Sequence, residues 1–69
     1  MNHTVPPQVR LANEIAVQFE HQPPDQAAQA IANHIRMFWD PSMRADLLSR
    51  ADTTDLNPLV VAAVKLLKD

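Results

Sequence analysis

Two arginines and two aromatic residues stand close together between residues 34 and 44, and these side chains are the ones best suited to binding chemistry. Arg36 and Arg44 carry planar guanidinium groups that fit carboxylates, phosphates and aromatic faces. Phe38 and Trp39 supply two of the three aromatic rings, including the only Trp. Trp and Arg are the residue types that most often carry binding energy at interfaces. A cluster of this kind could hold acidic groups of a partner or the phosphates of a cofactor.

Each of these residues also has a plainer interpretation. The arginines could be solvated or paired with Asp40 and Asp46 along a helix, and Arg50 is the weakest binding candidate of the three. Phe38 is expected in the core of a small helical domain. Trp39 is expected at the edge of the buried face, where it can contact both the core and a partner. The predicted partner-binding residues are Arg36, Trp39, Met43, Arg44, Leu59 and Leu66.

Residues for catalysis or metal binding are not arranged in any known pattern. His3, His21 and His34 match no two-histidine helical motif, and the chain has no Cys to complete a metal site. Ser42 and Ser49 fall within a predicted helix, without the strained turn that exposes a nucleophile. The absence of glycine removes phosphate-binding loops. We therefore predict no catalytic, cofactor-binding or metal-binding residue in this chain.

Residues 34–44 are held by helices, and two of the predicted helices begin with a capping residue followed by proline. Asp40 can accept hydrogen bonds from free amides, and Pro41 already has helical φ at a position that needs no amide proton. Asn57 and Pro58 repeat this pattern, and the proline pair at 23–24 ends the preceding helix. The sequence predicts an all-α fold, a small bundle of three to four short helices. It forms a single domain over 1–69, with an extended lead-in at 1–7 and helices at about 8–21, 24–39, 41–51 and 58–67.

Apolar residues at three- and four-residue spacing define one inward face on each of the first three helices. His34, one turn before Phe38, is expected to be partly buried and either to pack on that ring or to donate a single hydrogen bond. Ser42 is expected to help its helix begin. The predicted inward residues are Val9, Ala12, Ile15, Ala16 and Phe19, then Ala27, Ile31, Ile35 and Phe38, then Met43, Leu47 and Ala51, with Leu48 at the margin.

The helix at 58–67 has more apolar residues than one inward face needs. Such a helix is normally buried on all sides, and three short helices are not expected to surround a fourth. We therefore expect a partner protein to cover it, or the isolated chain to self-associate. A β-strand is the alternative for this segment. The inward residues are Leu56, Val60, Ala63, Val64 and Leu67, and the additional apolar residues are Leu59, Val61, Ala62 and Leu66.

Length and charge restrict the kind of partner. A chain of 69 residues buries only about 60% of its unfolded surface, so a partner protein is the expected support. The six Lys and Arg are spread along a chain of formal net charge −2, which argues against nucleic acid. The longest apolar run, at 59–64, is too short to span a bilayer, and no signal-peptide pattern is present. We expect a cytoplasmic protein with no nucleic-acid or membrane partner.

Three segments resemble the delta subunit of bacterial NAD-dependent, molybdenum-containing formate dehydrogenases. They are residues 9–16 with Phe19, residues 31–44, and residues 56–60. The middle segment is the specific one, because His-Ile-Arg is followed by Phe-Trp, an acidic residue, proline and Met-Arg. The resemblance covers most of the chain, from about Val9 to Val60.

The resemblance implies a noncatalytic small subunit that docks on the large catalytic subunit of formate dehydrogenase. That subunit would carry bis-molybdopterin guanine dinucleotide and iron–sulfur clusters, and other subunits would pass electrons through flavin to NAD. Two alternatives remain open. The chain could be an assembly factor that assists insertion of the molybdenum cofactor, or a free helical adaptor for an unrelated protein.

Overall fold

The structure, a computed structural model, describes residues 6–50 and 56–68. Within these residues it contains four helices and no strand. The all-α prediction is therefore confirmed, and the strand alternative for 58–67 is wrong. Residues 1–5 of the lead-in predicted at 1–7 lie outside the described part of the chain, as do residues 51–55, which include the predicted inward residue Ala51. The lead-in is shorter than predicted, because the first helix begins at Pro7. The helices are α1 (Pro7–Gln18), α2 (Pro24–Phe38), α3 (Pro41–Ser49) and α4 (Pro58–Lys68).

Every helix begins at a proline, and the four prolines are evenly spaced: 24 − 7, 41 − 24 and 58 − 41 all equal 17. Proline suits this position because the first helical amide has no partner within the helix and the ring fixes φ. Asn57 caps α4, since its Oδ1 accepts a hydrogen bond of 2.9 Å from the Leu59 amide. The proline starts predicted at 41 and 58 are therefore confirmed.

The helices α1, α2 and α3 end without a left-handed residue. No described residue has positive φ, and the chain has no glycine to adopt it. Instead α1 ends in a tight turn in which the Phe19 amide donates to the Ala16 carbonyl at 3.0 Å, and α3 ends in the same way with a bond of 3.0 Å from Arg50 to Leu47. These turns place the helix ends at Gln18 and Ser49, before the predicted ends at 21 and 51.

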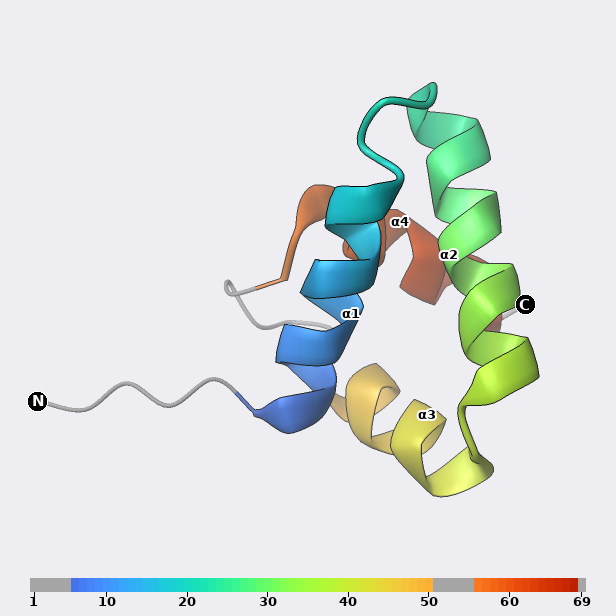
Figure 1. Ribbon diagram of the computed structural model, residues 1–69. Coiled ribbons are helices and arrows are strands. Elements are labelled where there is room, and N and C mark those ends of the chain that lie inside the picture. Colours follow the sequence, from blue (N-terminus) through green and yellow to red (C-terminus); the bar gives the residue numbers. More distant parts are fainter. Residues whose placement is uncertain (1–5, 51–55, 69) are drawn as a thin grey trace, which may run out of the picture.

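Packing of α2 against α4 is the most extensive contact between helices, while α1 touches all three others and α3 also contacts α4. Figure 1 shows α4 behind and between α1 and α2, with α3 at the end where α2 finishes. Ile31, Ile35 and Leu47 are among the largest fully buried side chains. The core cluster consists of Val9, Ala12, Ala16, Ile31, Ala32, Ile35, Trp39, Leu47, Leu56, Val60, Ala63 and Val64.

The prediction that α4 lacks cover within its own chain is wrong. Only Pro58, Lys65 and Lys68 of this helix are exposed, and its other residues are buried or half-buried. An eleven-residue helix is short enough for three neighbouring helices to cover most of its circumference. The large apolar side chains that remain exposed belong instead to the first two helices: Leu11, Val17, Met37 and Phe38. The argument for self-association from α4 therefore loses its basis.

Asn57 joins the start of α4 to α1. Its backbone amide donates to Asn13 Oδ1 at 2.8 Å, and its side-chain Nδ2 donates to Glu20 Oε2 at 3.4 Å. Since these residues are 44 and 37 positions from Asn57 in the sequence, the contacts fix where α4 enters the bundle. This arrangement places the far end of α4 beside α2 and α3.

Candidate partner-binding site

The corner between α2 and α3 is built around the Asp40 carboxylate. Its Oδ1 accepts a hydrogen bond of 2.8 Å from the Met43 amide and another of 2.9 Å from the Ser42 hydroxyl. These bonds confirm both the predicted cap and the predicted role of Ser42. The Met43 amide, with smaller contributions from Ser42 and the nearby Arg44 charge, lowers the pKa of Asp40 below its ordinary value of 3.8. The corner is therefore held by an ionised carboxylate at neutral pH.

Asp40→Ala is expected to destabilise the chain most above pH 3.8, with a smaller effect at lower pH. Because the folded-state pKa is lowered, the stabilisation by the ionised carboxylate is complete above the unfolded value and is lost as pH falls through the folded value. Thermal melts followed by circular dichroism from about pH 2 to pH 7 measure the difference from wild type.

Asp40→Asn is the matched control, because asparagine still offers a capping oxygen and does not titrate. It should melt closer to wild type than Asp40→Ala does at neutral pH. A difference between Asp40→Ala and wild type that stays the same at every pH would contradict this assignment of the cap.

The structure exchanges the expected positions of the two adjacent aromatic residues. Trp39 is 8% exposed and belongs to the core cluster, whereas Phe38 is 69% exposed. At about 100° per residue Phe38 falls between Ala27 and Ile31, which are both buried, so the period of α2 does not account for its exposure. Phe38 is the last residue of α2, where the regular inward face ends. Trp39 follows the helix with extended backbone, φ −96° and ψ 139°, so a helical wheel does not describe its direction. The prediction that Phe38 fills the core is wrong.

Met37, Phe38 and His34 form an exposed group that we call the corner patch. Met37 is 75% exposed. His34 is half-buried, and its ring centroid lies 4.8 Å from that of Phe38 with 42° between the ring planes, which confirms the predicted contact. Two large apolar side chains thus project into solvent at the end of α2, next to the helix-to-helix corner.

Arg36 connects α2 to the last turn of α4. Its Nη2 donates a hydrogen bond of 2.8 Å to the Leu66 carbonyl, and its Nη1 donates to Asn33 Oδ1 at 3.4 Å. Carbonyls in the last turn of a helix have no hydrogen-bond donor within the helix, and Arg36 supplies a donor to one of them. This contact, between residues 30 positions apart, gives Arg36 a structural role that the sequence analysis missed.

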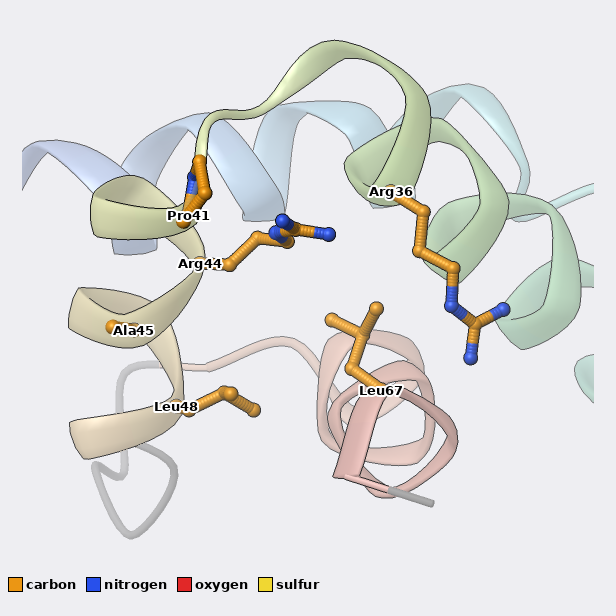
Figure 2. A pocket seen from close by; sticks show the side chains of 6 residues that line it. All are labelled: Arg36, Pro41, Arg44, Ala45, Leu48 and Leu67. Atoms are coloured by element: carbon orange, nitrogen blue, oxygen red, sulfur yellow. The ribbon is translucent and has the colours of Figure 1, made fainter.

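Arg44 and Arg36 both line a cleft of about 300 Å³ between α2, α3 and α4. We call it the arginine cleft; its lining residues are Arg36, Pro41, Arg44, Ala45, Leu48 and Leu67. Figure 2 shows Arg44 reaching from α3 toward Arg36, with Leu48 and Leu67 directed into the space below them. Arg44 is half-buried, and no described residue accepts a hydrogen bond from its guanidinium group. The cleft therefore combines an apolar floor with positively charged donors.

The other predicted site residues are partly buried or already paired within the chain. Met43, Leu59 and Leu66 are partly buried and pack against the core cluster. Arg50 pairs with Asp46 at 3.2 Å, one turn earlier on the same helix, which agrees with its weak standing as a binding residue. The structure thus brings Arg36 and Arg44 together in one cleft, leaves Trp39 in the core, and places Leu59 and Leu66 against that core.

No arrangement for catalysis stands out in the described part of the chain. Residues 6–50 and 56–68 contain no group of three or more His, Cys, Asp or Glu that could hold a metal ion. Ser42 donates to the Asp40 cap, and Ser49 donates to the Asp46 carbonyl at 2.7 Å. No helix in these residues is long and apolar enough to cross a membrane. The corner patch and the arginine cleft are the two features at the predicted binding segment.

Comparison with known protein families matches residues 8–64 to the family described as the NADH-dependent formate dehydrogenase delta subunit, FdsD. These residues include α1 from Gln8, all of α2 and α3, and α4 as far as Val64. The curated proteins and the solved structures yield no match. The family match agrees with the resemblance carried by residues 31–44. The chain therefore belongs to the delta subunit family of NADH-dependent formate dehydrogenases.

Proposed function

We propose that this chain is a noncatalytic small subunit that docks on the large molybdopterin-containing subunit of formate dehydrogenase and stabilises it. One observation carries the proposal: Met37 and Phe38 are 75% and 69% exposed at a corner whose core is already filled by Trp39. An apolar side chain that the fold does not need is costly to leave in water, and contact with another protein removes that cost.

The redox groups belong to the partner subunits in this proposal. The chain has no cysteine and no glycine, so it offers no thiolate for an iron–sulfur cluster and no glycine-rich loop for a nucleotide. Bis-molybdopterin guanine dinucleotide, iron–sulfur clusters, flavin and the NAD site would therefore lie in other subunits. Because the family is named for NADH, we place the complex in the cytoplasm, where NADH is generated and consumed.

Purification of the enzyme with and without this chain tests the proposal. We expect the wild-type chain to remain in the active enzyme as a stoichiometric component. Without it, yield, stability or molybdenum content should fall, while the rate of formate oxidation per molybdenum atom stays near normal. The measurements are subunit composition, metal content and rate normalised to metal.

Two results would contradict this proposal. A large loss of rate per molybdenum atom would mean that the chain takes part in formate oxidation directly. A fully loaded, active enzyme that never contains the chain, but cannot be loaded in its absence, would identify an assembly factor for cofactor insertion instead.

A further inference from the structure

We propose that the arginine cleft receives an acidic side chain from a segment of the partner subunit, with an apolar side chain of the same segment on the floor beside Leu48 and Leu67. The inference rests on the proposed docking function and names the chemistry of the contact.

The cleft has the size and shape for a small part of a protein. Its volume of about 300 Å³ lies at the lower limit of ligand pockets, which suits one or two side chains better than a cofactor. Three helices form it: Arg36 comes from α2, Leu67 from α4, and the other lining residues from α3. A peptide segment can therefore lie along α3 and insert side chains between α2 and α4.

Arg44 is the group in the cleft that most needs an acceptor. Its guanidinium group carries five donors, yet none of the described residues accepts from it, and the side chain is half-buried. The Arg36 guanidinium is already held by the Leu66 carbonyl at 2.8 Å, which reduces the entropy lost when it binds a further group. A carboxylate can accept two parallel hydrogen bonds from one guanidinium group. The pair thus presents a positive site that is partly ordered in advance.

The surroundings favour a carboxylate over a phosphate. The start of α3, which could otherwise bind a phosphate, is occupied by the Asp40 carboxylate, whose Oδ1 accepts from the Met43 amide at 2.8 Å. Asp40 also places a negative charge near Arg44, which opposes a doubly charged anion more than a singly charged one. The apolar Leu48 and Leu67 complete a site suited to an acidic residue with an apolar neighbour.

The test is binding of Arg44→Gln to the large catalytic subunit, measured as a dissociation constant with both purified proteins. Glutamine keeps most of the side-chain length and removes the charge. We expect Arg44→Gln to bind at least about tenfold more weakly than wild type. Raising sodium chloride from about 50 mM to about 500 mM should increase the dissociation constant of wild type by a larger factor than that of Arg44→Gln. Arg44→Lys keeps the charge but not the paired hydrogen bonds, so its dissociation constant should lie between those of wild type and Arg44→Gln.

Arg10→Gln is the matched control, because Arg10 is an exposed residue of α1 outside the cleft. It removes the same charge and should bind within about twofold of wild type. Both glutamine variants should melt as wild type does by circular dichroism, so that a loss of binding is not a loss of fold.

The outcomes separate this inference from the proposed function. Equal binding by Arg44→Gln and wild type overturns the inference and leaves the docking function intact. Equal weakening by Arg10→Gln and Arg44→Gln also overturns it, since net charge rather than the cleft would then be recognised. Failure of the wild-type chain to bind any formate dehydrogenase subunit overturns both.

Discussion

Trp39→Ala is expected to unfold a large fraction of the isolated chain at 25 °C. Trp39 is 8% exposed and packs in the core cluster at the point where α2 ends. Truncation of a buried Trp costs about 3 to 5 kcal/mol because it removes apolar contacts and leaves a cavity. A domain of 69 residues has a free energy of unfolding of roughly 3 to 10 kcal/mol at typical values per residue. Urea denaturation followed by circular dichroism measures the loss.

Phe38→Ala is the control for this experiment, because it removes the adjacent aromatic ring. Phe38 is 69% exposed, and the ring contact in which it takes part is with His34. Exposed substitutions usually change the free energy of unfolding by less than about 0.5 kcal/mol. We therefore expect the urea midpoint of Phe38→Ala to stay near that of wild type. Wild-type stability in Trp39→Ala, or unfolding in Phe38→Ala, would show that the two rings have the opposite roles.

Phe38→Ala is also expected to weaken binding to the large catalytic subunit by about 2 kcal/mol or more, or roughly 30-fold in the dissociation constant. In the proposed complex the Phe38 ring and the neighbouring Met37 leave water, and a large aromatic side chain at the centre of such a contact carries much of the binding energy. Surface plasmon resonance or calorimetry with the purified catalytic subunit measures the effect. Most of it should appear as faster dissociation.

Val17→Ala provides the comparison for that measurement. Val17 is 60% exposed on α1, so it tests whether loss of any exposed apolar side chain has the same effect. We expect its dissociation constant to remain within about threefold of wild type. Stronger weakening by Val17→Ala than by Phe38→Ala would move the interface from the corner patch to α1.

The sequence predicted those parts of the fold that depend on neighbouring residues. The caps at Asp40 and Asn57 follow from side-chain oxygens that lie within three residues of the amides they bind. The Arg50–Asp46 pair and the contact of His34 with Phe38 each join residues four positions apart on a helix. Local spacing is enough to predict such contacts, because a helix fixes the distance between its own residues.

The even spacing of the helix-starting prolines, and Pro7 as the first of them, were local signals that the sequence analysis left unused. Pro7 and Pro24 begin α1 and α2 in the same way as Pro41 and Pro58 begin the later helices. The absence of glycine likewise contained information on helix ends. Without a residue that readily adopts positive φ, α1 and α3 finish in tight turns, earlier than periodicity alone predicted.

The sequence by itself determined an all-α chain with proline starts, a capped corner and no thiolate, because these follow from composition and from contacts within one or two turns. Only the tertiary structure decided that Trp39 faces the core and Phe38 faces solvent, since Trp39 follows α2 with extended backbone and the helical period does not set its direction. It likewise decided that Arg36 binds the Leu66 carbonyl and shares a cleft with Arg44. Those groups come from different helices, and their meeting depends on the angles at which the helices pack.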